Sequence, residues 1–132
     1  MFFGTGESWY AKPDAGALLV SPADEVATHP HDAFADDMTL AEGLDRYQQM
    51  VVPEVTKPLA TWAGLRSFAP DRTLVLGRDP DVPEFVWCAG QGGYGFQTSP
   101  AASTLLADLV MGRAPVLDAA SVAALRPDRL RP

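Results

Sequence analysis

The sequence predicts a small α+β fold with antiparallel strands and two amphipathic helices. Short apolar runs alternate with turn residues over positions 1–30, which is typical of antiparallel hairpins. A run with helical spacing follows at 38–50. Three strand-like runs come next, and a second helix is expected at 100–111, between Pro100 and Gly112. Because strands and helices do not alternate as repeated strand–helix–strand units, the pattern favours α+β over a parallel α/β sheet.

The first predicted element is an antiparallel hairpin. Its strands are the apolar runs 8–12 and 17–21, and residues 13–16 (Pro-Asp-Ala-Gly) form the turn. A helix is expected next, over 38–50, with a capping box at 39–42 and Pro53 beyond its end. This helix carries apolar side chains at helical spacing, namely Ala41, Leu44, Tyr47 and Val51.

The second half of the chain is predicted to run strand, turn, strand, turn, strand, helix. The expected strands cover 59–68, 73–77 and 84–89. The helix is expected from Pro100 to Met111, and Gly112 suits the left-handed position that ends many helices. One short helix, at 118–125, is expected in the Pro-rich tail.

The last predicted strand, Phe85–Ala89, is apolar on both faces, as in a central strand that is covered on each side. The helix at 100–111 covers only one face. We therefore expect the chain to be part of a larger fold whose remaining portion covers the other face. The alternative is a small α+β domain that covers the strand with its own hairpin. Left uncovered, the strand is expected to drive self-association into a homo-oligomer.

Four glycines, at positions 90, 92, 93 and 95, separate this strand from the helix. Glycine adopts positive φ readily and lets a ligand approach the bare main chain. Ser99 is expected to cap the helix and Pro100 to begin it. A helix start of this kind points free N–H groups and the positive end of a dipole at one place, so the predicted ligand is electron-rich. The alternative is a plain flexible connection.

Composition and charge narrow the classes of partner. The chain has 132 residues, a net charge of −7 and 47% hydrophobic residues, as expected of a soluble globular protein. An acidic surface does not neutralise phosphates, which argues against nucleic acid and anionic membranes. No apolar stretch is long enough to span a bilayer, and no Lys or Arg precedes Lys12 as a signal peptide requires. The single cysteine, Cys88, indicates a reducing compartment, so we expect a cytoplasmic location.

Other candidate sites are weaker. His29, His31 and Asp32 offer two imidazoles and a carboxylate, but no further ligand cluster exists and Pro30 indicates a turn, so no metal site is expected. The acidic pairs at 24–25 and 36–37 are interpreted as solvated turn and helix-start charges rather than acid–base groups. Cys88 is expected to be an inert core thiol. The glycine loop lacks the Lys-Ser/Thr ending of a P-loop, which argues against nucleoside triphosphate hydrolysis.

An ordered series of motifs runs through most of the chain. It comprises the segments Trp62–Phe68, Pro70–Asp71, Val75–Gly77 and Ala89–Gly95. This series resembles the C-terminal portion of the FAD-dependent D-amino-acid oxidase superfamily, and within it the D-arginine dehydrogenases most. The segments 10–13 and 19–25 are similar to the substrate-domain sheet of that group. The family's N-terminal half, with its dinucleotide fingerprint, is absent from the sequence.

The resemblance implies a fold and a division into two parts. Residues 1–68 correspond to an antiparallel substrate-domain sheet with its helix. Residues 69–132 correspond to the last strand and helix of the FAD-binding domain, with a glycine loop that caps the flavin. The chain is thereby expected to be a fragment that lacks the N-terminal Rossmann-type half.

The resemblance also implies roles for individual residues. Arg66 corresponds to the arginine that binds the substrate carboxylate, and Tyr10 to a tyrosine whose hydroxyl helps to hold it. Gly93 corresponds to a main-chain contact to the substrate amino group. Without the resemblance, Arg66 is equally well a surface arginine and Tyr10 an amphipathic strand residue. The loop that would line the flavin comprises Gly90, Gln91, Gly92, Gly93, Tyr94, Gly95, Phe96, Gln97 and Thr98.

The implied activity is oxidative deamination of D-amino acids such as D-arginine to 2-oxo acids and ammonia, with FAD as the cofactor. The chain would act only with the missing N-terminal FAD-binding half, supplied in the same polypeptide or by a partner chain. The alternative is a non-catalytic fragment or oligomerisation module that binds no flavin by itself.

Overall fold

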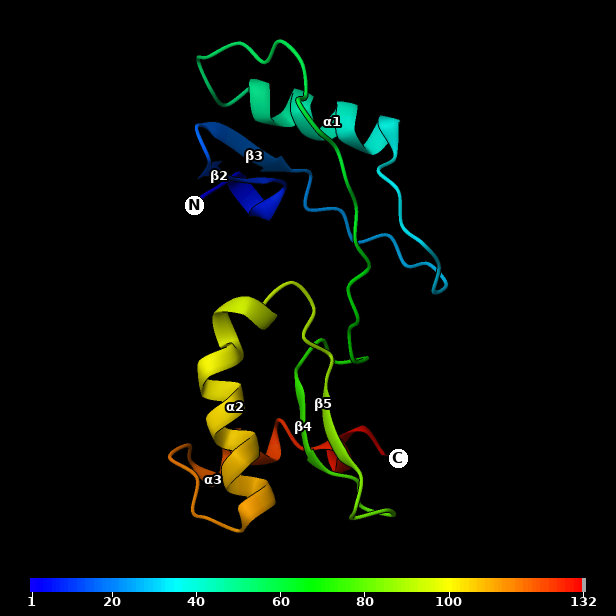
Figure 1. The fold of residues 1–132 in the computed structure, drawn as a ribbon, viewed down its shortest axis with the longest axis vertical. Coiled ribbons are helices and arrows are strands. Elements are labelled where there is room, and N and C mark those ends of the chain that lie inside the picture. The colour runs from blue at the N-terminus through cyan, green and yellow to red at the C-terminus, as the bar shows by residue number, and fades with distance from the viewer. Residues whose placement is uncertain (132) are drawn as a thin grey trace. The chain divides into compact units, whose positions relative to one another are not determined.

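The structure is a computed structural model that describes residues 1–131. The chain divides into two compact units, Met1–Leu65 and Arg66–Pro132, and each is described by itself (Figure 1). Within the described residues the strands form two antiparallel sheets, one in each unit, and helices pack beside them. The predicted α+β class is therefore confirmed.

The sheet of the first unit has the strand order β1-β2-β3. The predicted hairpin is present, and its turn is tighter than expected because β2 continues through Asp14. Two residues, Ala15 and Gly16, close it with φ values of +45° and +82°, the left-handed pair that a two-residue hairpin turn requires. The register pairs Asp14 with Ala17 and Tyr10 with Ser21. The elements of this sheet are β1 (Phe2–Phe3), the short 3-10 helix η1 (Thr5–Glu7), β2 (Tyr10–Asp14) and β3 (Ala17–Ser21).

Helix α1 (Asp37–Gln48) is present where the spacing predicted it, but the capping box at 39–42 is wrong. The cap is Asp36, whose Oδ1 accepts the Thr39 N–H at 2.8 Å and the Thr39 hydroxyl at 2.8 Å. Thr39 is thus a donor to the cap rather than the cap itself. Hydrogen bonding to Thr39 also lowers the pKa of Asp36 below its ordinary value. The helix begins one residue early because a carboxylate is at least as good a cap as a threonine.

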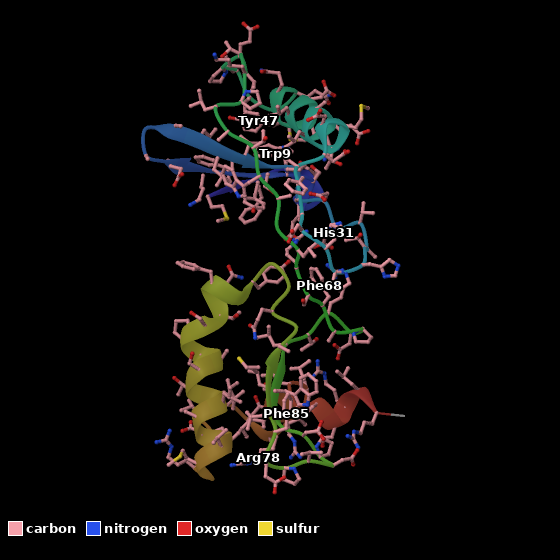
Figure 2. All side chains as sticks on the ribbon, turned by 45° about the vertical axis from the view of Figure 1, so that its right-hand side comes forward. Trp9, His31, Tyr47, Phe68, Arg78 and Phe85 are labelled. Atoms are coloured by element: carbon pink, nitrogen blue, oxygen red, sulfur yellow. The ribbon has the colours of Figure 1, made fainter. Side chains whose placement is uncertain are left out.

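The core of the first unit lies between the sheet and α1. Trp9, Ala11 and Tyr47 are buried together, and the rings of Trp9 and Tyr47 meet edge to face at 5.0 Å (Figure 2). Ala41 was expected on the apolar face but is exposed. Gly43 is buried instead, and a Cβ at this position would lie 2.4 Å from the Cβ of Pro22. The helix packs this closely because glycine leaves room for the chain after β3.

The expected strand at 59–68 is wrong, because the structure assigns no strand to these residues. Leu59 and Trp62 are 82% and 66% exposed, so these two apolar side chains lie outside the core clusters of the described residues. A strand forms only when a neighbouring edge accepts its hydrogen bonds. Proline at positions 53 and 58 adds extended backbone without donors.

The second unit is a β-hairpin with a long helix packed against it. β4 (Val75–Arg78) and β5 (Val86–Ala89) pair antiparallel, and Leu76 is buried against Ala102 and Leu105 of α2. The outer edge of β4 is bound by the tail, since the Leu76 N–H donates to the Leu125 carbonyl at 2.8 Å. The remaining elements are α2 (Gly95–Met111), α3 (Ala119–Ala123) and the 3-10 helix η2 (Pro127–Leu130).

Two predicted features of the second unit are confirmed, and one arginine connects its hairpin to its long helix. Gly112 ends α2 with a φ of +67°, as predicted. The short tail helix is also confirmed, although it covers fewer residues than the expected 118–125. Arg78 ties the turn of the hairpin to α2, because its guanidinium donates to the Pro83 carbonyl at 2.7 Å and to the Val110 carbonyl at 3.0 Å (Figure 2).

Strand β5 is not buried on both faces within its own unit. Phe85 and Trp87, which share one face of the strand, are 51% and 37% exposed, and their rings meet at 4.9 Å. Cys88, on the opposite face, is exposed as well. The expected core position of this thiol is therefore wrong within the described residues, because α2 covers β4 and leaves the β5 side of the hairpin open.

Candidate functional site

The glycine loop connects the end of β5 to the start of α2. Gly90 and Gly92 have φ values of +67° and +55°, so two of its four glycines occupy the left-handed region that other residues avoid. The loop is held by main-chain hydrogen bonds, from the Tyr94 N–H to the Gln91 carbonyl at 3.0 Å and from the Gly92 N–H to the Ser67 carbonyl at 2.9 Å. It is a shaped loop, which weighs against the alternative of a plain flexible connection.

Gly92 is required for space as well as for backbone conformation. A Cβ at this position would lie 2.7 Å from Cε1 of Phe68, closer than real Cβ atoms approach a neighbour. The segment 67–69 therefore runs directly against the bare main chain of the loop. At Gly92, the space that the missing side chain leaves is filled by the ring of Phe68.

Two of the predicted substrate residues come together beside this loop. Arg66 lies next to Gly93, since a Cβ on Gly93 would be 3.1 Å from Nη1 of Arg66. The guanidinium of Arg66 thus lies beside the main chain of Gly93, which was expected to contact the substrate amino group. Tyr10 belongs to the first unit, on β2, where its ring lies 6.4 Å from that of Phe3. The structure does not place Tyr10 with respect to the other two.

Helix α2 begins at Gly95 rather than Pro100, so the expected cap at Ser99 is wrong. Pro100 lies inside the helix and has no N–H for the Phe96 carbonyl, which an uninterrupted helix would supply. The Ser99 hydroxyl supplies it instead, at 3.1 Å. The residues 95–99, expected to be part of the loop, form the first turn of the helix because this hydroxyl replaces the missing donor.

The first turn of α2 presents the donors that were expected of the helix start. An α-helix leaves its first N–H groups without intrahelical acceptors, here those of Gly95, Phe96 and Gln97. No acidic side chain lies in this turn to repel an anion. The positive end of the helix dipole and these N–H groups therefore favour an electron-rich ligand.

The side chains of the loop divide into those that are exposed and those that bond internally. Phe96 and Tyr94 are 97% and 48% exposed. The Thr98 hydroxyl is bound to the Tyr94 carbonyl at 2.8 Å, so it acts in the helix rather than toward a ligand. Gln91 packs beneath Gly95 and its amide nitrogen lies 3.8 Å from the Cys88 sulfur. The loop thus offers a ligand mainly backbone groups and two aromatic rings.

A second feature, which the sequence did not predict, is a stack of cations on Phe68. The guanidinium carbons of Arg72 and Arg66 lie 4.4 Å and 5.6 Å from the centre of the Phe68 ring. Both distances are within the range of cation–π attraction. Phe68 was part of the motif series that carried the resemblance, but its spacing from Arg72 gives no sign that the two side chains meet.

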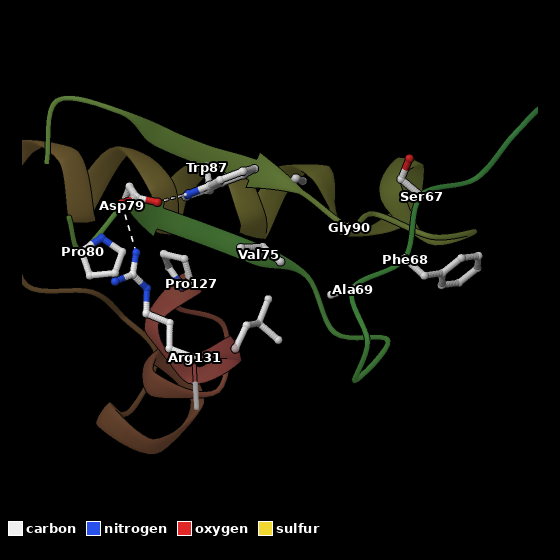
Figure 3. A pocket seen from close by; sticks show the side chains of 12 residues that line it. Ser67, Phe68, Ala69, Val75, Asp79, Pro80, Trp87, Gly90, Pro127 and Arg131 are labelled. Atoms are coloured by element: carbon white, nitrogen blue, oxygen red, sulfur yellow. Dashed lines mark hydrogen bonds and ion pairs between the residues drawn. The ribbon is translucent and has the colours of Figure 1, made fainter. Parts of the chain in front are cut away.

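An open pocket of about 420 Å³ lies on the face of the hairpin that carries Trp87 (Figure 3). The Trp87 indole N–H donates to Oδ2 of Asp79 at 2.9 Å, and Oδ1 of Asp79 lies 3.5 Å from Nη2 of Arg131. The hydrogen bond from Trp87, followed by that from the Asp81 backbone, lowers the pKa of Asp79 below its ordinary value. The lining is otherwise largely apolar and includes Phe68, Val75, Pro80 and Pro127.

The residues present fit one end of a flavin and not the whole of FAD. The N–H groups at the start of α2 suit the carbonyl and nitrogen acceptors on the edge of an isoalloxazine ring, and the glycine loop leaves main chain accessible beside them. The pyrophosphate of FAD is ordinarily held by a parallel strand–helix–strand unit. Both sheets within residues 1–131 are antiparallel. The described part of the chain therefore accounts for the ring end only.

The described residues contain neither a cluster of metal ligands nor a helix that could span a membrane. In residues 1–131 no three His, Cys, Asp or Glu side chains gather as a metal site would require, and His31 instead lies 3.5 Å from the Thr28 hydroxyl. None of the helices in this range is both long and apolar enough to cross a membrane.

Comparison with known proteins supports the same cofactor chemistry. The FAD dependent oxidoreductase family (DAO) matches residues 3–109, which is most of the chain. The chain is also similar to a glycine oxidase from Pseudomonas aeruginosa, with 36% identity over 101 residues. That match covers 74% of this chain and 28% of the oxidase, so the chain spans just over a quarter of the length of this relative. FAD is the cofactor of the matched family. The chain belongs to the DAO family of FAD-dependent oxidoreductases.

Proposed function

We propose that the chain is the C-terminal part of an FAD-dependent D-amino-acid dehydrogenase, and that D-arginine is among its substrates. The observation that carries the proposal is the position of Arg66, whose Nη1 lies 3.1 Å from the place of a Cβ on Gly93. A planar guanidinium binds a carboxylate through two parallel hydrogen bonds. Its location beside the glycine loop and the start of α2 would bring an amino acid next to the flavin ring.

Each group of the site has a part in binding and orientation. Arg66 would hold the α-carboxylate, and the main chain of Gly93 would meet the amino group. The resemblance gives the hydroxyl of Tyr10 a part in holding the carboxylate as well. N–H groups at the start of α2 would hold the electron-rich edge of the ring. Bound FAD would accept the hydride from the substrate α-carbon, while the protein orients the reactants.

Amino-acid chemistry is supported by the relative's name, glycine oxidase, although that name does not fix the substrate of this chain. The preference for D-arginine depends on the resemblance of the motif series at 62–95. The FAD-binding half, whether in the same polypeptide or in a partner chain, is part of the proposal. A cytoplasmic location stays a prediction from the single cysteine.

The test combines the chain with an FAD-binding half and FAD, and follows reduction of an electron-accepting dye with D-arginine or L-arginine. We expect reduction with the D-isomer only. Arg66→Lys should raise the KM about tenfold, because an ammonium cannot form the paired hydrogen bonds. Arg113→Lys is the matched control, since Arg113 pairs with Asp108 at the other end of α2. A well-folded, flavin-loaded complex without D-isomer-dependent reduction would overturn the proposal.

The second candidate is a non-catalytic fragment or oligomerisation module. The observation in its favour is that both sheets in residues 1–131 are antiparallel, so the described residues contain no parallel strand–helix–strand unit of the kind that ordinarily holds the FAD pyrophosphate. The visible absorption of the purified 132-residue chain distinguishes the two. Stoichiometric flavin in that chain would contradict the module, whereas a colourless oligomer would support it for the chain alone.

A further inference from the structure

One aromatic ring connects the proposed carboxylate-binding residue to the glycine loop. The Arg66 guanidinium carbon lies 5.6 Å from the centre of the Phe68 ring, and that of Arg72 lies 4.4 Å from it. Phe68 is half-buried, whereas both arginines are exposed. The ring is thus the most buried of the three side chains, and both cations lie within cation–π distance of it.

The ring itself is fixed by the loop. Residue 67 accepts the Gly92 N–H at 2.9 Å, and the ring edge occupies the space that a Cβ on Gly92 would need. Phe68 therefore cannot approach the loop more closely, and the hydrogen bond keeps it from moving away. Arg66 lies on this ring and beside Gly93, so the ring is one of the contacts that place its cation next to the loop.

The turn at 69–73 holds the other side of the stack. The Arg72 N–H donates to the Ala69 carbonyl at 2.8 Å, and Arg72 has a φ of +61°, which an L-residue adopts only when its surroundings hold it there. Asp71 in the same turn is bound by Arg129 at 2.7 Å. These contacts are all made by the protein's own groups, so the turn itself presents Arg72 to the ring.

We infer that Phe68 is a positioning residue that keeps the Arg66 guanidinium beside Gly93, ready for a carboxylate substrate. The inference rests on the proposed function for the identity of that substrate. An arginine side chain that is free to change rotamer must be ordered each time it binds a ligand, and a ring that already holds it removes much of this cost. Loss of the ring should therefore weaken substrate binding and leave the chemical step unchanged.

The first test uses the 132-residue chain and needs no cofactor. In NMR spectra, the Nε–Hε resonances of Arg66 and Arg72 should both carry ring-current shifts from Phe68. Phe68→Leu should remove both shifts, Phe68→Tyr should keep them, and Phe85→Leu is the matched control because Phe85 stacks on Trp87 instead. If Phe68→Leu does not fold, pentafluorophenylalanine at position 68 keeps the shape of the ring and inverts its quadrupole. An Arg66 resonance that is unchanged in Phe68→Leu, or in the pentafluorophenylalanine variant where that one is used, would overturn the inference.

The second test measures dye reduction by the chain combined with its FAD-binding half. Phe68→Leu should raise the KM for D-arginine about fivefold, the size of one cation–π contact, with kcat changed less than about twofold. Phe68→Tyr should restore the KM, and Phe85→Leu should not change it. A fall in kcat at constant KM would contradict the positioning role. If the unsubstituted complex itself shows no D-isomer-dependent reduction, the proposed function fails, while the resonance of Arg66 still decides the role of Phe68.

Discussion

Arg129 and Asp71, 58 residues apart in sequence, form a two-point ion pair in which Nε donates to Oδ2 at 2.7 Å and Nη2 donates to Oδ1 at 3.1 Å. The same guanidinium donates to the carbonyls of Thr73 at 2.8 Å and Arg126 at 2.9 Å. The Arg129 side chain is only 13% exposed. One side chain from η2 thus binds both the turn before β4 and the residue that precedes η2.

Acid should weaken this pair in a defined range of pH. The hydrogen bond from Arg129, followed by that from the Thr73 backbone, lowers the pKa of Asp71 from 3.8 to about 2. A carboxyl whose pKa is lower in the folded state stabilises the fold above its unfolded pKa, and this stabilisation is lost as the pH falls through its folded pKa. Urea unfolding between about pH 4 and pH 2 should therefore show a steeper loss of stability for the wild type than for Asp71→Asn. Parallel curves for the two proteins would contradict the prediction.

Arg129→Lys should lower the urea midpoint at neutral pH. Lysine keeps the charge, but its ammonium cannot serve Asp71 through two parallel bonds and also reach two carbonyls. The Thr73 carbonyl would then lose a donor next to the edge of β4. Arg113→Lys is the control, because its side chain is 58% exposed and makes one ion pair. Equal midpoints for the two lysine variants would show that the extra bonds of Arg129 do not matter.

Gly92→Ala should destabilise the chain more than Gly112→Ala. The two glycines have similar φ values, +55° and +67°, so both substitutions cost about 1–2 kcal/mol for a left-handed alanine. Only at Gly92 does the new Cβ meet a neighbour, 2.7 Å from Phe68. This overlap should add about 1–3 kcal/mol to the loss in free energy of unfolding. Adding Phe68→Leu to Gly92→Ala should recover part of it, and an additive double variant would exclude the overlap as the cause.

Leu76→Ala should be among the most destabilising substitutions in the second unit. Leu76 is 1% exposed and contacts α2 from the centre of β4, so its removal leaves a cavity worth about 2–5 kcal/mol in free energy of unfolding. Leu117, which is 43% exposed, is the matched control, and its replacement should cost about 0.5 kcal/mol or less. Urea unfolding followed by circular dichroism measures both.

Ser99 and Pro100 should behave as a coupled pair. Ser99→Ala removes the hydroxyl that serves the Phe96 carbonyl and should cost about 1 kcal/mol. Pro100→Ala restores the main-chain N–H for the same carbonyl, so it should be neutral or stabilising. In the double variant the cost of Ser99→Ala should disappear. A double-mutant cycle measures the coupling, and a zero interaction energy would show that the hydroxyl does not substitute for the N–H.

The sequence predicted the elements whose determinants are local. The hairpin followed from its turn residues, and the end of α2 followed from Gly112. The strand at 59–68 was predicted wrongly because a strand depends on a partner edge that periodicity cannot identify. The start of α2 was displaced by five residues because the standard rule places proline in the first turn, and the hydroxyl of Ser99 is a compensation that the rule does not include.

The part of the candidate site that could be predicted is the part that the motif series at 62–95 contains. Arg66 and Gly93 were singled out together, and the structure places them side by side. The stack of Arg66 and Arg72 on Phe68 could not be predicted, because it depends on a left-handed residue at position 72. The pair of Asp71 with Arg129 depends on how the tail returns to β4, which no local pattern records. The roles of Tyr10, Arg66, Gly93 and the loop 90–98 stay predictions.

Helix α2 is rich in hydroxyl groups, and each of them is already in use. Four side chains donate to main-chain carbonyls of the same helix or of the residue before it, at distances from 2.6 to 3.1 Å; they are Thr98, Ser99, Ser103 and Thr104. A hydroxyl bonded in this way needs no water as its acceptor. These four hydroxyl groups would therefore keep their acceptors if α2 were covered by another protein surface, so their burial would leave no donor without a partner.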